Sequence, residues 1–205
     1  MKTRDRILDY ALLLFNLKGE PNVSTLEIAN ELGISPGNLY YHFHGKEPLT
    51  LGLFQRFQNE LAPLLAPPAE VELDIEDCWL LLHLIVERLA AYRFLFQDLS
   101  NLTSRLPKLE HGIRLWLIQL KRMLNWLLLQ LAGDNPLASD SSRLVQLVEQ
   151  ITLTLLFALD YQRIMGREGE SRLVVYQVMM LLAPHLPEDS RQAAEHLAKR
   201  YLHDE

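Results

Sequence analysis

Residues 35–46 of this chain read S-P-G-N-L-Y-Y-H-F-H-G-K, and they decide the fold that we expect. Ser35 suits the N-cap of a helix, because its hydroxyl accepts a hydrogen bond from an otherwise unpaired backbone N–H of the first turn. Pro36 suits the first helical position, where its fixed φ is helical and no N–H is needed. Leu39 and Phe43 share one helix face, which can dock on a core. A helix this short is not stable alone, so a neighbouring element must support it.

A second helix is predicted directly upstream, from the capping-box sequence S-T-L-E at residues 24–27. We expect Leu26, Ala29 and Leu32 to form its buried stripe, and Gly33 to end it with a positive φ. A helix, a short turn and a capped second helix form the layout of a helix-turn-helix, here at about residues 24–43, whose second helix enters the DNA major groove. An ordinary helical hairpin in an all-α bundle fits the same pattern, so spacing alone leaves both interpretations open.

Many residues at fixed spacing in the first fifty positions carry a resemblance to a known family. They are Arg6, Ile7, Leu8, Ala11, Leu14, Phe15, Gly19, Ile28, Ala29, Leu32 to Ser35, Gly37 to Phe43, Lys46, Glu47 and Leu49. At these positions the chain resembles, without gaps, the N-terminal domain of the Tet repressor family. The resemblance implies an all-α fold, with an N-terminal helix-turn-helix DNA-binding domain and a C-terminal helical domain for effector binding and dimerisation. It also implies a homodimer and repression that a small molecule relieves. Pro48 departs from the family, whose members commonly have a good helix former there, but it is tolerated if Gly45 caps the next helix.

The candidate DNA contacts lie on the short helix, opposite its docking face, and at the starts of the helices before and after it. The resemblance implies that Thr25 and Lys46 hold phosphates. We reject metal binding by His42 and His44, because no third ligand stands at a suitable spacing. The full set of candidates is Thr25, Ser35, Pro36, Gly37, Asn38, Tyr40, Tyr41, His42 and Lys46.

Composition and charge indicate an ordinary globular protein. Hydrophobic residues make up 49% of the 205 and charged residues 22%, a balance that argues against disorder. The net charge is -6, while five basic and five acidic side chains balance in residues 1–46, so the acidic excess lies in the remainder. A single cysteine, Cys78, excludes an internal disulfide. Apolar runs are too short to span a bilayer and no signal-peptide layout is present, so we expect a cytoplasmic chain with no membrane partner.

The sequence Ala66-Pro67-Pro68-Ala69 predicts the domain boundary, because two prolines end a helix and favour extended backbone. We therefore expect a DNA-binding domain at residues 1–65, with helices from Thr3 to Leu17 and from Lys46 to Leu65 besides the helix-turn-helix. The second domain, 70–205, should hold helices at about 75–91, 108–131, 142–165, 171–182 and 189–202.

Residues 79–131 combine a large apolar surplus with a few isolated polar groups, as effector pockets do. A plain leucine-rich core has the same composition, so both interpretations stay open. Tyr92-Arg93-Phe94 resembles a run that marks a subgroup of the family, but it names no ligand. Few charges in the proposed wall favour a small, neutral, apolar effector. Its candidate residues are Trp79, His83, Phe94, Phe96, Trp116, Leu120, Leu124, Asn125 and Tyr161.

The helices within 142–182 are the candidate dimer interface, because the resemblance implies that two such helices pair with the same two of a second subunit. We expect Leu155 in the seam. The alternative is that both helices are used fully in their own core.

We therefore expect a repressor that a small apolar effector releases from a palindromic, double-stranded operator. A regulator without an effector, an all-helical enzyme and a helical interaction module are the alternatives. The sequence has no glycine-rich phosphate loop, no nucleophile elbow and no di-iron Glu-x-x-His pair, so we expect no enzyme, cofactor or metal.

Overall fold

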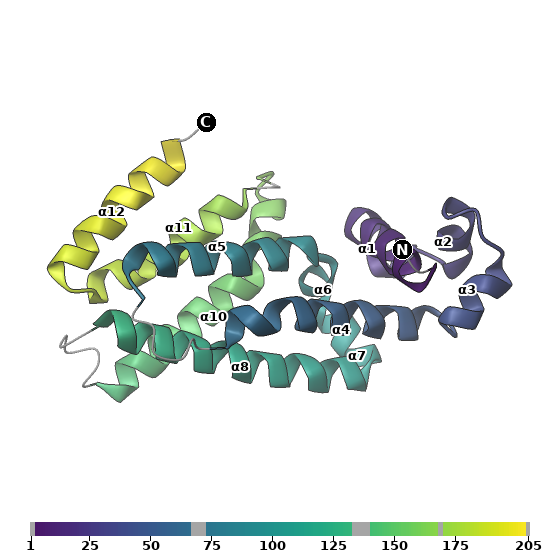
Figure 1. Cartoon of the computed structure of the whole chain (residues 1–205), viewed down its shortest axis with the longest axis horizontal. Coiled ribbons are helices and arrows are strands. Elements are labelled where there is room, and N and C mark those ends of the chain that lie inside the picture. Colours follow the sequence, from purple (N-terminus) through teal and green to yellow (C-terminus); the bar gives the residue numbers. More distant parts are fainter. Residues whose placement is uncertain (1–2, 67–72, 133–139, 168–169, 204–205) are drawn as a thin grey trace. The chain divides into compact units, whose positions relative to one another are not determined.

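The computed structural model describes residues 3–66, 73–132, 140–167 and 170–203, and these ranges form helices without any strand (Figure 1). The all-α prediction is confirmed. The two prolines of the predicted boundary, Pro67 and Pro68, lie outside the described residues, as do residues 133–139.

The helices begin and end close to the positions that capping and periodicity predicted. The first four are α1 (Thr3–Lys18), α2 (Thr25–Glu31), α3 (Pro36–His42) and α4 (Lys46–Leu65), with a 3-10 turn, η1 (Glu20–Asn22), between α1 and α2. The later elements are α5 (Ile75–Ala91), α6 (Phe94–Gln97), α7 (Leu99–Arg105), α8 (Pro107–Ala132), α10 (Ser141–Ile164), α11 (Ser171–Leu182), η2 (Ala183–His185) and α12 (Glu188–His203). The short helices α6 and α7 have no counterpart in the prediction.

The chain forms two compact units whose boundary differs from the predicted one. The first unit holds residues Met1–Glu60 together with Tyr92–Arg114, and the second holds Leu61–Ala91 together with Leu115–Glu205. Helices α4 and α8 therefore contribute residues to both units. The segment with α6 and α7 belongs to the first unit because its side chains complete the core of that unit.

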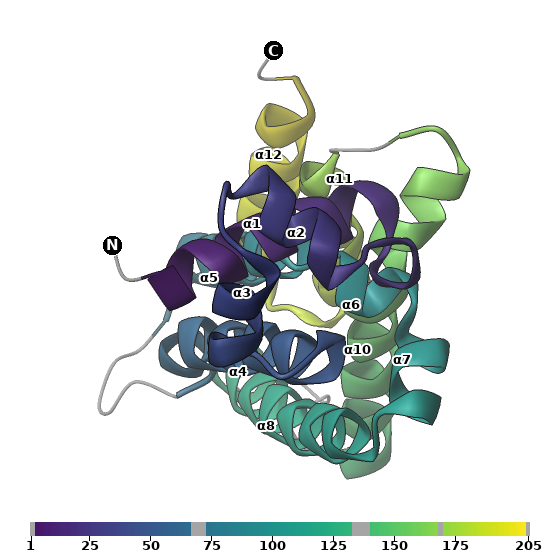
Figure 2. The same cartoon turned by 90° about the vertical axis from the view of Figure 1, so that its right-hand side faces the viewer.

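In the first unit α1 packs against α2, and α2 against α3 (Figures 1 and 2). The predicted docking face of α3 is confirmed, since Leu39 is 2% and Phe43 3% exposed. The predicted stripe of α2 was wrong at Leu26, which is 54% exposed, whereas Ile28 and Ala29 are fully buried. Leu26 lies in the first turn of α2, and more than half of its side chain faces solvent.

Three aromatic side chains of the segment 92–97 insert into the first unit. The Phe94 ring lies 5.2 Å from the ring of Phe15 in α1, and the rings of Tyr92 and Phe96 lie 5.4 and 5.6 Å from Phe57 in α4. Tilted rings at these separations add to the stabilisation that burial provides. Residues 92–97 are therefore packed on α1 and α4, the helices that precede α2 and follow α3 in the chain.

Tyr92 also ends a polar network between α1 and α4. Its hydroxyl donates to Glu60 Oε1 at 2.8 Å and accepts from Arg56 Nε at 2.8 Å. Arg56 Nη1 donates to Asp9 Oδ1 at 2.6 Å. Burial raises the pKa of Tyr92 to about 12, so the phenol is neutral near neutral pH and serves as a hydrogen-bond donor.

The second unit is a helical body in which α11 packs against α5, α10 and α12. Helix α10 is long and apolar enough to cross a membrane by length and composition alone, and 44% of its most apolar stretch is buried within the protein. Leu155 of α10 is 1% exposed and belongs to the core of this body. Its predicted place in a seam between subunits was wrong, because a side chain so completely covered has no surface left for a partner.

Candidate nucleic-acid interface

Local hydrogen bonds hold α3 at a fixed angle to α2. The hydroxyls of Ser24 and Ser35 accept from the backbone N–H three residues later, each at 3.1 Å. Gly33 has a φ of 66°, which an L side chain rarely adopts, and this turns the chain out of α2. The Ile34 N–H then donates to the Ala29 carbonyl at 3.0 Å. Both predicted N-caps and the glycine turn are confirmed.

Both halves of the predicted capping box are confirmed, because a hydrogen bond from the Ser24 backbone N–H to the Glu27 carboxylate helps to lower the pKa of Glu27. The Glu27 carboxylate accepts from Lys18 Nζ at 2.6 Å, so it pairs with α1 as well as flanking the cap. This hydrogen bond lowers the pKa of Glu27 and raises that of Lys18. The Glu27 carboxylate thus serves the N-cap backbone of α2 and the ion pair with α1 at the same time.

The outer face of α3 is a continuous exposed polar surface. Tyr40 and Tyr41 are 60% and 79% exposed, and the rings of Tyr40 and His44 lie 4.9 Å apart. The Tyr41 ring meets that of His42 edge-on, with ring centres 5.2 Å apart. The exposed residues in the first turns are Ser35, Pro36, Gly37 and Asn38. Hydroxyl, amide and imidazole groups on one short helix suit hydrogen bonding to base edges and phosphates.

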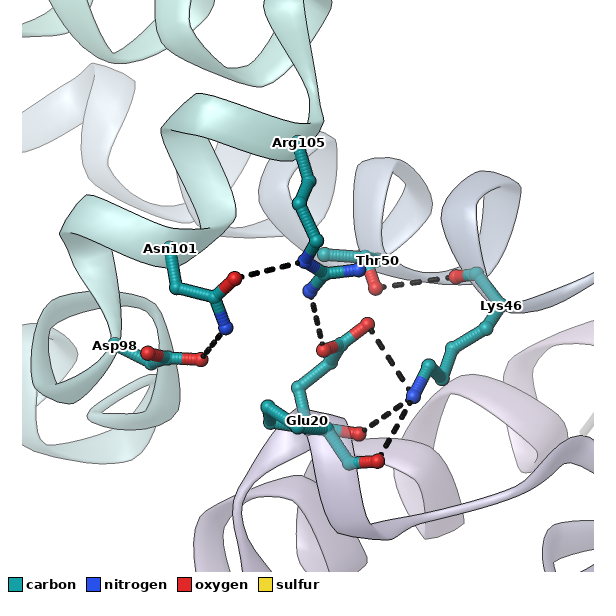
Figure 3. Close-up of polar contacts among 7 residues, drawn as sticks. Glu20, Lys46, Thr50, Asp98, Asn101 and Arg105 are labelled. Carbon is teal, nitrogen blue, oxygen red and sulfur yellow. Dashed lines mark hydrogen bonds and ion pairs between the residues drawn. The ribbon is translucent and has the colours of Figure 1, made fainter.

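Two of the predicted phosphate ligands, Thr25 and Lys46, lie at helix starts. Thr25 is the first residue of α2 and is partly exposed. Lys46 begins α4, and its Nζ donates to the backbone carbonyls of Glu20 at 3.0 Å and Pro21 at 3.3 Å (Figure 3). Lys46 therefore ties the start of α4 to η1.

Glu20 is a functional candidate that sequence reasoning missed. Its side chain is 1% exposed, yet it accepts from Arg105 Nη2 at 2.7 Å and lies 3.8 Å from Lys46 Nζ. Arg105 is 85 residues away in the chain, so no local pattern signals this contact.

The structure does not bring the nine predicted effector residues together. Phe94 and Phe96 are in the core of the first unit, whereas the other seven belong to the second unit. Four of those seven are buried, namely Trp79, Trp116, Leu120 and Leu124, and His83 is partly exposed. Asn125 and Tyr161 each line a different groove.

The described residues of the second unit form three surface grooves between pairs of helices. The α10–α11 groove has a volume of about 830 Å³ and is lined by Leu153, Thr154, Phe157, Ala158, Tyr161, Tyr176, Gln177, Met180 and Leu181. The α5–α8 groove, of about 280 Å³, is lined by Pro63, Leu64, Ala66, Leu73, Asp77, Leu80, Leu81, Leu84, Met123 and Trp126. The α8–α10 groove, of about 360 Å³, is lined by Ile118, Lys121, Arg122, Asn125, Val145, Val148 and Glu149.

The potential metal-ligating groups among the described residues include the free cysteine Cys78. No group of three or more His, Cys, Asp or Glu side chains in these ranges is placed to hold a metal ion. Cys78 is buried, and this burial raises the pKa of its thiol to about 12, so it remains a thiol near neutral pH.

Two family models cover most of the chain. Residues 7–53 match the model described as bacterial regulatory proteins, tetR family, and residues 56–194 match the one described as bacterial transcriptional repressor. The first match contains α2 and α3, and the second spans α5 to α11.

Individual known proteins similar to this chain are also transcriptional regulators. A TetR-family transcriptional regulator from Marinobacter aquaeolei VT8 is 30% identical, with a TM-score of 0.92 over 98% of this chain and 99% of that one. TtgW, an uncharacterized HTH-type transcriptional regulator of Pseudomonas putida, is 33% identical over 78 residues. That match covers 38% of this chain and about half, 55%, of TtgW. A structure of SmeT with triclosan is 20% identical, with a TM-score of 0.62 over 92% of this chain and 93% of SmeT, and shows likeness of fold alone.

Proposed function

Because the chain belongs to the TetR family of bacterial transcriptional regulators, we propose that it is a repressor that a small apolar effector releases from a palindromic operator. The observation that carries this proposal is the exposed polar face of α3, which two serine caps and a positive-φ glycine hold rigidly on α1 and α2. A rigid support matters because base recognition requires fixed donor and acceptor positions.

We propose that α3 enters the major groove with its first turn and Tyr40 nearest the bases. The groups directed to base edges or adjacent backbone are then Ser35, Gly37, Asn38 and Tyr40, with Pro36 fixing the start of the helix. The phosphate ligands are Thr25, Tyr41, His42 and Lys46. A base contact gives specificity, whereas a phosphate contact strengthens binding to every sequence.

The α10–α11 groove is the proposed dimer interface. Leu153, Phe157 and Tyr161 stand four residues apart along α10 and are 54%, 49% and 54% exposed. Large apolar side chains in a contiguous row are costly to leave in water, and a second copy of the same helices covers them by two-fold symmetry. The DNA-binding domains of the two subunits then read half-sites about 34–36 Å apart, or a multiple of that spacing.

The α5–α8 groove is the proposed effector site. Leu80, Leu84 and Trp126 line it together with Asp77, the one ionisable side chain among the described residues that line it. Its volume, about 280 Å³, lies just below the usual range for ligand pockets, about 300–1,000 Å³. SmeT, of related fold, has been solved with triclosan, a small molecule. An effector releases DNA only if it binds more tightly to a conformation that holds DNA poorly.

Selection of bound fragments from genomic DNA at physiological salt tests the proposed function. We expect one shared sequence with two inverted half-sites, because a symmetric dimer presents two copies of α3. Recovery of fragments without a common sequence would contradict a sequence-specific regulator. Adding apolar compounds to the selected complex then tests release, with the variant Leu84→Trp, which fills the α5–α8 groove, as the matched control for the effector site.

A further inference from the structure

Glu20 carries a carboxylate that is almost fully buried within the first unit. Its side chain is 1% exposed, and it is flanked by two cations, Arg105 from α7 and Lys46 from α4 (Figure 3). A buried carboxylate is costly unless a cation or hydrogen-bond donors compensate it. Arg105 Nη2, at 2.7 Å, is within hydrogen-bond distance of the carboxylate, whereas Lys46 Nζ, at 3.8 Å, is not.

Lys46 has one donor left over in this arrangement. Its ammonium has three N–H groups, and two of them bond to the carbonyls of Glu20 and Pro21. The carboxylate is too far away to accept the third, and the Lys46 side chain is still 28% exposed. A DNA phosphate can therefore take the third N–H without displacing either carbonyl.

Helix α7 sets the position of Arg105. The Nε of Arg105 donates to Asn101 Oδ1 at 3.0 Å, and Asn101 Nδ2 donates to Asp98 Oδ2 at 2.8 Å (Figure 3). Asn101 and Arg105 are on α7, and Asp98 is its N-cap position. Any displacement of α7 thus moves the guanidinium relative to Glu20. Because α8 follows α7 directly and continues into the second unit, a change there has a covalent path to Arg105.

We propose that Arg105 regulates operator affinity by determining whether Glu20 or a DNA phosphate takes the third N–H of Lys46. The proposal rests on the proposed DNA-binding function. With Arg105 in place, the carboxylate is compensated and Lys46 is available to the phosphate. When Arg105 moves away, the Lys46 ammonium pairs with the Glu20 carboxylate. The DNA-binding domain then loses one phosphate ligand, while α3 keeps its conformation. Arg105 is in this sense a positioning residue that acts through Glu20 and Lys46.

The salt dependence of operator binding tests this coupling, because each phosphate contact contributes about 0.9 to the log-log slope. The slope is measured for the full chain with each of the single substitutions Arg105→Gln, Arg105→Lys, Glu20→Gln and Lys46→Gln. It is also measured for the double variant that combines Arg105→Gln with Glu20→Gln. We expect Arg105→Gln to weaken operator binding and to reduce the log-log slope by about 0.9 for each subunit. Glu20→Gln removes the competing carboxylate, so the double variant should regain the wild-type slope. Arg105→Lys, which keeps a cation near Glu20, should also restore part of it.

Three results would overturn the proposal. An unchanged slope in Arg105→Gln means that Lys46 does not depend on Arg105. A reduced slope that persists in the double variant means that Arg105 itself contacts phosphate. An unchanged slope in Lys46→Gln means that Lys46 is not a phosphate ligand. Circular dichroism melting of each variant identifies any loss of folding, and failure of the wild type to bind specifically refutes the proposed function instead.

Discussion

Replacing Phe157 by arginine is expected to separate the two subunits of the proposed dimer. Phe157 is 49% exposed in the middle of the α10–α11 groove. An aromatic side chain carries roughly 200 Å² of surface, so about 100 Å² remains for a partner to cover, worth about 2.5 kcal/mol. Two-fold symmetry makes this contact occur twice in the dimer, so its loss costs about 5 kcal/mol of dimerisation free energy. This loss raises the dissociation constant of the dimer by about three to four powers of ten.

Analytical ultracentrifugation over micromolar concentrations measures this change directly. The matched control is Gln130→Arg, which adds the same charge at an exposed position of α8 outside the α10–α11 groove. The control should sediment as the wild type does, and Phe157→Arg as a folded monomer that binds DNA weakly. A Phe157→Arg variant that stays dimeric at the same concentrations as the wild type would refute the assignment of this face.

Three further predictions concern the first unit. Between about pH 10 and 12 the free energy of unfolding should fall more steeply with pH in the wild type than in Tyr92→Phe. The reason is that burial raises the pKa of Tyr92 to about 12, so the unfolded chain loses this proton first. Urea denaturation that gives the same pH dependence of the unfolding free energy for both proteins would count against it. Gly112→Ala should lower the melting temperature, since its Cβ would overlap the Phe54 ring at a cost of about 1–3 kcal/mol that outweighs the gain in helix propensity; a higher melting temperature would show that the ring moves freely. Ser35→Ala should cost about 1 kcal/mol in urea denaturation, because the Asn38 N–H loses its acceptor, and no change would exclude the cap as a source of stability.

Local chemistry made much of the first unit predictable. Both N-caps of the helix-turn-helix, at Ser24 and Ser35, depend on residues within one turn of each other, and so does the glycine turn at Gly33. The docking of Leu39 and Phe43 follows from helical spacing. Prediction succeeded where the deciding interactions were close in the sequence.

Interactions between distant residues were not predictable. Phe94 and Phe96 were assigned to an effector pocket on composition, but they pack on Phe15 and Phe57, which lie far away in the sequence. An aromatic residue fits a core and a pocket equally well, and no pattern within 92–97 names its partners. The same limit hid the pairing of Glu20 with α7.

Helical periodicity also left open which face of α10 is free. Leu155 and Phe157 are both apolar, and their spacing alone is compatible with either one facing a partner. Leu155 is buried within the body, and Phe157 is half exposed, because α11 and α5 cover one side of α10. A helix apolar on two faces needs the packing of its neighbours to distinguish core from interface.

Recognition of the operator sequence by α3 is tested most directly by the ratio of affinities for operator and scrambled DNA, measured at one physiological salt concentration. The wild type should prefer the operator by at least about a thousandfold. Asn38→Ala, which leaves the backbone N–H of the Ser35 cap intact, should reduce this preference about 10- to 100-fold by removing a base contact while keeping its affinity for scrambled DNA. Equal wild-type binding to both DNAs, or an undiminished preference in Asn38→Ala together with Tyr40→Ala, would contradict recognition through α3.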